Sequence, residues 1–155
     1  NIGDTIEFIS LSPYRVRVTG RTKHHINVFG EELIIDNAEK ALSIAAKKTG
    51  AHFVDYTVGP IFMNGDKKGA HEWIIEFKVL PSDLGEFIKI LDYQLKCENS
   101  DYEAKRYKDL TLNPPKVHQA REKLFYDWFA KNKKLGGQNK GPRLSNKRNF
   151  IEELF

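Results

Sequence analysis

Residues 51–80, AHFVDYTVGPIFMNGDKKGAHEWIIEFKVL, decide the fold of this chain. In the second half, apolar residues occupy every other position, which is the period of a strand with one buried face: Trp73, Ile75, Phe77 and Val79. Ile74 lies on the opposite face, so that face is not expected to be wholly solvated. Two strands are therefore predicted, at residues 51–58 and 72–80. The glycine- and lysine-rich loop Asn64–Gly69 is predicted to join them as a hairpin.

A helix is predicted on each side of this hairpin. Before it, Asp36 is expected to cap a helix together with Glu39, and Gly50 is expected to end that helix. After it, Pro81 ends the strand and Ser82 is expected to cap a second helix. The apolar residues of this second helix recur at the spacing of one helical face: Leu84, Phe87, Ile88, Leu91 and Leu95.

The rest of the chain supplies shorter elements. Two strands are predicted at the start of the chain, at Thr5–Ile9 and Tyr14–Thr19. After the second helix, a helical turn is predicted at Ser100–Arg106 and a strand at Lys108–Leu112. Two further helices are predicted at His118–Lys131 and Asn146–Leu154. This order predicts an α+β fold. We expect a mixed β-sheet covered by helices on one face, in a split βαβ-like order and preceded by a short two-stranded segment.

Composition limits the classes of protein. A chain of 155 residues with 40% hydrophobic and 30% charged residues is typical of one soluble domain. No apolar run approaches the roughly 18 residues of a membrane helix, and no secretory leader is evident, so a cytoplasmic location without membrane contact is expected. The single cysteine, Cys97, excludes an intramolecular disulfide. Adjacent strand residues such as His24 and His25 point to opposite faces, so no metal site is expected.

Positive charge is concentrated near the C-terminus. Ten Lys or Arg residues lie between Lys116 and Arg148, where only two acidic residues oppose them. Such a stretch can attract nucleotide phosphates or a nucleic acid, or it can be a solvated basic surface. Within it, glycines of the loop Gly136–Arg143 allow close backbone approach to a ligand, and Lys140 adds charge. The loop lacks the glycine–lysine spacing of a Walker P-loop, and a flexible basic loop remains the alternative.

Three segments, in order, resemble motifs of the adenylate-forming superfamily. Ile2-Gly3-Asp4 resembles the end of its Tyr-x-x-Gly-Asp motif, and residues 20–33, GRTKHHINVFGEEL, resemble its hinge motif, Gly-Arg-x-(Asp/Lys)-x-x-Ile-x-x-x-Gly. Lys140 is the third match. Sixteen residues separate Asp4 from Gly20, close to the spacing of that superfamily.

Within the superfamily, the chain resembles the Gretchen Hagen 3 (auxin-responsive promoter) family of acyl-acid–amido synthetases in its bacterial form. Asn99–Arg106 is similar to that family's Asn-Ser-x-Tyr…Arg segment, and Gln138–Arg143 is similar to its Gln-x-Lys-x-Pro-Arg ending. The resemblance covers nearly the whole chain. It departs at Gly141, where plant members tend to have Thr, and in the basic, slightly longer segment before Lys140; these departures bear on substrate choice more than on reaction class.

The resemblance implies a mobile C-terminal domain of an enzyme that uses ATP with Mg²⁺. Residues 1–20 would end the N-terminal domain and lead to the hinge, and residues 21–155 would form the lid. The chain opens without Met, and we interpret it as a fragment that is inactive alone. Its expected partners are its own N-terminal domain, a small-molecule acyl acid and an amine, with no nucleic acid.

The resemblance also implies roles for individual residues. Asp4 would bind the ribose hydroxyls of ATP, Arg21 would approach the ribose and phosphates, and Lys23 would lie at the hinge. Lys140 would catalyse adenylation. Further candidates are Arg143, Tyr102 and Arg106; the last two share a helix face and could equally be a packing pair.

Two other classes of protein remain open. One is a basic α+β nucleic-acid-binding module with aromatic side chains on its sheet. Against it, the chain lacks the Lys/Arg-Gly-Phe/Tyr-x-Phe type of strand motif, and Trp73–Phe77 alternates as core residues do. The other is a ligand-sensing regulatory domain, a role that split βαβ folds often have.

Overall fold

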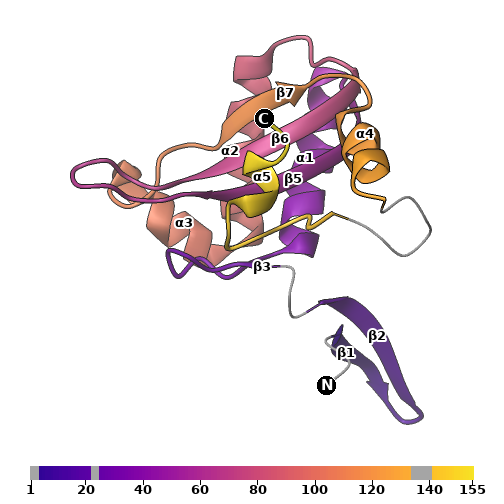
Figure 1. Cartoon of the computed structure of the whole chain (residues 1–155). Helices are drawn as coiled ribbons and strands as arrows, with labels where there is room; N and C mark the ends of the chain where they lie inside the picture. The colour runs from indigo at the N-terminus through magenta and orange to yellow at the C-terminus, as the bar shows by residue number, and fades with distance from the viewer. Residues whose placement is uncertain (1–3, 22–24, 134–140) are drawn as a thin grey trace.

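A three-stranded mixed sheet forms the centre of the computed structural model, which describes residues 4–21, 25–133 and 141–155 (Figure 1). Strand β6 (Ala70–Val79) lies between β5 (His52–Ile61), with which it pairs antiparallel, and β7 (Lys116–Ala120), with which it pairs parallel. The predicted hairpin is thus confirmed. On the outer edge of β5, Val58 forms a parallel bridge with Leu144.

Helices α1 (Ile35–Thr49) and α2 (Leu84–Glu98) cover one face of this sheet (Figure 1). Trp73 and Ile75 are fully buried there, as the alternating pattern predicts. Because Trp73 lies in the core, the sheet does not present the exposed aromatic surface that an RNA-binding sheet uses. The buried face ends before Val79, which is 47% exposed.

The opposite face of the sheet is also covered, which corrects the expectation of helices on one face only. Helices α4 (Leu124–Lys131) and α5 (Asn149–Glu152) lie over it (Figure 1). Ile74 is 2% exposed and belongs to a second apolar cluster, whose other buried members are Ala120, Phe125, Phe150, Ile151 and Leu154. Gly59 admits α5 closely, because a Cβ at that position would lie 2.7 Å from Ile151 Cδ1.

The helix ends differ by one or two residues from the predicted ones. The N-cap of α1 is Ile34, whose backbone N–H donates to the side chain of Asn37 at 3.3 Å, so the predicted Asp36 capping box is wrong. The N-cap of α2 is Asp83, which accepts from the backbone N–H of Glu86 at 3.0 Å, instead of Ser82. Gly50 ends α1 in the left-handed conformation, with φ 70°, as predicted.

Two predicted elements in the C-terminal half are wrong. Residues 108–112 are not a strand: they follow α3 (Ser100–Arg106) through the 3-10 turn η1 (Tyr107–Asp109), in which Lys108 has φ 49°. The helix expected from His118 begins only at Leu124, because residues 116–120 pair with β6 as strand β7. The terminal helix α5 is shorter than expected.

The first two strands form a separate hairpin that projects from the α+β body (Figure 1). Strand β1 (Asp4–Leu11) pairs antiparallel with β2 (Tyr14–Arg21), and a second small pair, β3 (His25–Ile26) and β4 (Leu33–Ile34), follows. One face of the β1–β2 hairpin exposes apolar side chains by half or more: Ile6, Phe8, Tyr14 and Val16. A Glu7–Arg17 ion pair of 2.7 Å lies on the other face. In the part of the chain that the structure describes, no helix is long and apolar enough to cross a membrane.

The burial of Ile74 gives a test of the second covered face. Ile74→Ala should lower the unfolding free energy of the 155-residue chain by about 2–4 kcal/mol, because it opens a cavity beneath α4 and α5. Urea denaturation measures this. Val54→Ala on β5, where the side chain is 58% exposed, is the matched control and should cost less than about 1 kcal/mol. Equal small costs for both variants would contradict a buried second face.

Candidate functional site

The structure places the predicted site residues in three separate regions. Lys23 and Lys140 lie outside the described residues, so their predicted roles stay predictions. Asp4 and Arg21 are direct partners in the register of the β1–β2 hairpin. Arg143 lies beside β5, and Tyr102 and Arg106 lie on α3.

The segment that directly follows Lys140 is fixed along the edge of β5. We call residues 141–145 the anchored segment. The backbone N–H of Val58 donates to the carbonyl oxygen of Arg143 at 2.9 Å, and the N–H of Ser145 donates to the carbonyl of Val58 at 3.0 Å. The Thr57 hydroxyl donates to the carbonyl of Pro142 at 2.6 Å. These are the bonds of a short parallel strand addition.

The Arg143 side chain adds a lateral contact to the anchored segment. Its guanidinium lies 2.7 Å from the Asp55 carboxylate and 4.6 Å from the ring centroid of Tyr56. The orientation of an arginine side chain is fixed when its guanidinium is ion-paired to a carboxylate and stacked on an aromatic ring. Side-chain exposures of 29% for Arg143 and 30% for Asp55 place this pair at the surface boundary.

Gly141 begins the anchored segment at a position with no room for a side chain. A Cβ there would lie 2.6 Å from Cζ of Phe150 and 3.3 Å from Cζ of Phe129. The absence of a side chain at Gly141 therefore leaves the space that the Phe150 ring of α5 occupies.

Helix α4, which precedes residues 134–140, is tied to the same sheet. Glu76 on β6 is 5% exposed, and it accepts from the backbone N–H of Lys123 at 2.7 Å and more weakly from that of Phe125 at 3.4 Å. A carboxylate at this end satisfies the free N–H groups of the first helical turn and complements the helix dipole. The chain on both sides of residues 134–140 is thus held by β5 and β6.

Tyr102 and Arg106 take part in a buried network centred on Asp92 of α2. Asp92 accepts from the Tyr102 hydroxyl at 2.9 Å and from Nε and Nη2 of Arg106 at 2.7 and 2.9 Å. Arg106 also donates to the carbonyl oxygen of Leu112 at 2.6 Å. Both side chains point into the protein, which favours the packing role over contact with a ligand.

The ionisation of this network follows from its geometry. Burial raises the pKa of the Asp92 carboxyl, but hydrogen bonds from Arg106, Lys96 and Tyr102 outweigh burial, so that the pKa lies below its ordinary value. Burial, followed by the negative charge of Asp92, raises the pKa of Tyr102 well above its ordinary value. Asp92 is therefore charged and Tyr102 neutral at physiological pH.

A buried Glu31–His71 pair lies next to this network and was not predicted. Glu31 is fully buried, lies 2.8 Å from Nε2 of His71, and accepts from the backbone N–H of Phe29. Burial raises the pKa of Glu31, but the hydrogen bond and the electrostatic interaction with His71 lower it by more, so the net shift of the pKa is downward. The His71 ring stacks on Tyr102, with centroids 5.4 Å apart. Nothing in the local sequence distinguishes Glu31 from the neighbouring Glu32, so only the fold reveals this pair.

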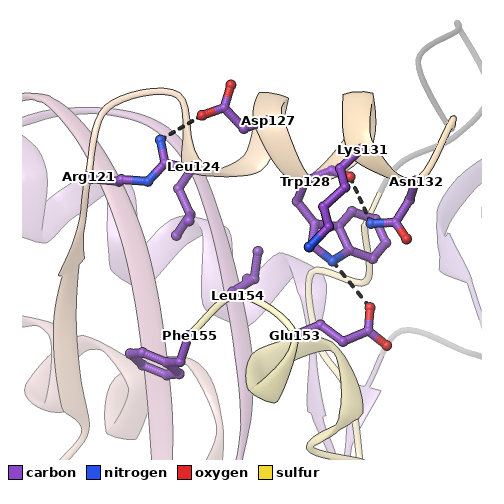
Figure 2. Close-up of a pocket in the computed structure, with 9 residues that line it drawn as sticks. All are labelled: Arg121, Leu124, Asp127, Trp128, Lys131, Asn132, Glu153, Leu154 and Phe155. Carbon is purple, nitrogen blue, oxygen red and sulfur yellow. Dashed lines mark hydrogen bonds and ion pairs between the residues drawn. The ribbon is translucent and has the colours of Figure 1, made fainter.

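Two open pockets flank α4. The first, of about 510 Å³, lies between α4 and the last residues of the chain, where Figure 2 shows Arg121 paired with Asp127 at 2.6 Å and Trp128 bonded to Glu153 at 3.2 Å. The second, of about 530 Å³, lies between β5 and α4 and is mostly apolar, with lining residues that include Val54, Asp55, Phe125, Tyr126 and Phe129. Within residues 4–21, 25–133 and 141–155, no group of three His, Cys, Asp or Glu side chains could hold a metal ion.

The comparisons with known proteins give one family match and solved structures of similar fold. A family model described as GH3 family C-terminal domain matches residues 36–149. Among solved structures, the chain is similar to "GH3.15 acyl acid amido synthetase", with 14% sequence identity and a TM-score of 0.75 over 99% of this chain and 29% of that one. It is similar to "AtGH3.15 acyl acid amido synthetase in complex with 2,4-DB", with 13% identity and a TM-score of 0.75 over the same shares. The chain thus spans 29% of the length of these proteins. A comparison with curated proteins finds no significant sequence match.

The close contact at Gly141 predicts a coupled pair of substitutions. Gly141→Ala should lower the unfolding free energy by about 1–3 kcal/mol, because the new Cβ displaces the Phe150 ring. In a Phe150→Leu background the same change should cost clearly less, which a double-mutant cycle by urea denaturation measures. Strict additivity of the two costs would contradict the contact.

The Asp92 network predicts a loss of stability in acid. Because the folded pKa values of Asp92 and Glu31 lie below their unfolded values, their contribution to stability is complete above the ordinary carboxyl range, at about pH 5, and is lost as the pH falls through the folded pKa values. Asp92→Asn should cost about 3 kcal/mol at pH 7, since it leaves the buried Arg106 charge with the half-exposed Asp109 as its carboxylate partner. The urea midpoint as a function of pH measures both effects. Asp66→Asn, in the exposed β5–β6 loop, is the control; a similar pH profile for wild type and Asp92→Asn would refute the role of Asp92.

Proposed function

Because the chain belongs to the GH3 family and is its C-terminal domain, we propose that it is the mobile domain of an enzyme that adenylates a carboxylic acid and transfers the acyl group to an amine. The family match over residues 36–149 is the observation that carries this proposal. The solved structures of the same fold are described as acyl acid amido synthetases, which supports the same reaction class. No observation favours the nucleic-acid-binding or ligand-sensing alternatives.

The proposed reaction has two steps. In the first, a carboxylate oxygen attacks the α-phosphorus of ATP, which forms acyl-AMP and releases pyrophosphate. In the second, an amine, proposed to be that of an amino acid, attacks the acyl carbon, forms the amide and releases AMP. Mg²⁺ would accompany ATP, with ligands from outside this chain.

Lys140 is the proposed catalytic residue of the first step. Attack of a carboxylate on a phosphate brings two anions together, and a lysine between them stabilises the charge that develops. One such contact in a closed site contributes about 3 kcal/mol, roughly a hundredfold in rate. In support, the chain that follows Lys140 is held by β5 and provides a firm attachment for a residue that must reach a defined position.

Asp4 and Arg21 are proposed to bind the nucleotide, with Asp4 accepting hydrogen bonds from the ribose hydroxyls and Arg21 near the ribose and phosphates. Their pairing in the β1–β2 register supports a shared ligand, since cross-strand partners lie side by side. Lys23 is proposed as the hinge residue.

The domain boundary is part of the proposal. We assign residues 1–20 to the end of an N-terminal domain and residues 21–155 to the mobile domain. The exposed apolar face of the β1–β2 hairpin supports this division, because a two-stranded ribbon is only marginally stable without a covering layer. The N-terminal domain, an acyl acid and an amine are the proposed partners, and the cytoplasm is the proposed location.

Substitution of the lysine tests the proposal. In the full-length enzyme, Lys140→Ala should slow ATP–pyrophosphate exchange by about a hundredfold, whereas amide formation from supplied acyl-AMP should change little. Exchange assays across a panel of carboxylic acids measure the first step, and amide formation is measured by product analysis. Lys133→Ala, which removes an exposed positive charge seven positions earlier in the sequence, is the matched control, and the isolated 155-residue chain is the negative control. Equal losses in both steps would contradict the assigned role, and no exchange with any acid would contradict the enzyme class.

A further inference from the structure

The anchored segment is bonded to a strand of the central sheet. Its partners lie on β5, which pairs along nearly its whole length with the buried central strand β6. The Thr57 residue is 1% exposed and its hydroxyl donates to Pro142, two residues after Lys140. The Asp55 carboxylate holds Arg143, three residues after Lys140. Two side chains of one strand therefore bind the chain directly after the proposed catalytic lysine.

We propose that Asp55 and Thr57 are positioning residues of the adenylation step, which fix the direction in which the chain leaves β5 toward Lys140. This inference rests on the proposed function and deepens it. Neither residue needs to contact ATP or the acyl acid; each acts through Pro142 or Arg143 and then through the backbone.

The geometry favours positioning over a simple stabilising role for Asp55. The Asp55 and Arg143 side chains are about 30% exposed, and an ion pair of that exposure contributes little to stability. The Arg143 guanidinium of this pair also lies over the Tyr56 ring, a contact that a fully solvated ion pair would not make. Reaction rate depends on such placement far more steeply than stability does, because a shift of about 1 Å in a catalytic group can cost a hundredfold.

Two conservative variants in the full-length enzyme test the inference. Asp55→Asn keeps the shape and removes the charge that holds Arg143, and Thr57→Val keeps the shape and removes the donor to Pro142. Each should slow ATP–pyrophosphate exchange by about tenfold or more, while amide formation from supplied acyl-AMP changes by less than about twofold. In a Lys140→Ala background, Asp55→Asn should cause no further loss, because residues that act as one unit are not additive.

The control is Glu98→Gln, which breaks the ion pair with Lys40 on the helical layer. It should leave both steps unchanged. Equal losses in both steps for Asp55→Asn, or an undiminished further loss in the Lys140→Ala background, would overturn the positioning role and leave the proposed function intact. Absence of exchange in the wild-type enzyme would contradict the proposed function, and the positioning role with it.

Discussion

Over residues 72–76, strand β6 is paired along both edges and buried on both faces, and the arrangement of the other elements follows from this. Its alternating side chains divide the core into two clusters, with Trp73 and Ile75 beneath α1 and α2 and Ile74 beneath α4 and α5. A strand buried on both faces leaves little freedom for its neighbours, because protein interiors are close-packed. The anchored segment gains its fixed position from this core, through β5.

Two buried carboxylates of β6 attach the C-terminal part of the chain to the sheet. Glu76 binds the first turn of α4, and Glu72 lies 2.8 Å from both Arg148, at the start of α5, and His118 of β7. Burial raises the pKa of Glu72, but hydrogen bonds from Arg148 and His118 outweigh burial and lower it. Through these contacts the two glutamates attach α4, α5 and β7 to an otherwise apolar face of the sheet.

The sequence predicts elements where local pattern and tertiary packing agree. The hairpin of residues 51–80 was predictable, because apolar residues at every second position over a long segment indicate a strand with one buried face. Strand β7 was not, since five residues acquire their strand character from parallel pairing with β6, distant in sequence. Likewise, Arg143 could be selected from the sequence as a candidate, but its partner Asp55 could not, because only the fold brings the two together. The sequence left the role of Tyr102 open, because its buried partner Asp92, which accepts from the Tyr102 hydroxyl, is recognised only in the fold.

The parallel pairing of β6 with β7 sets an order for folding. The β5–β6 hairpin joins neighbouring segments and can form early, whereas β7 comes only after the intervening helices, and α5 comes later still in the sequence. During synthesis, the face that bears Ile74 therefore stays uncovered until α4 and α5, which follow β7 in the chain, have been made. An unpaired strand edge beside a bare apolar face favours aggregation. Nascent chains that end before α5 should accordingly depend on chaperones more strongly than chains that include it.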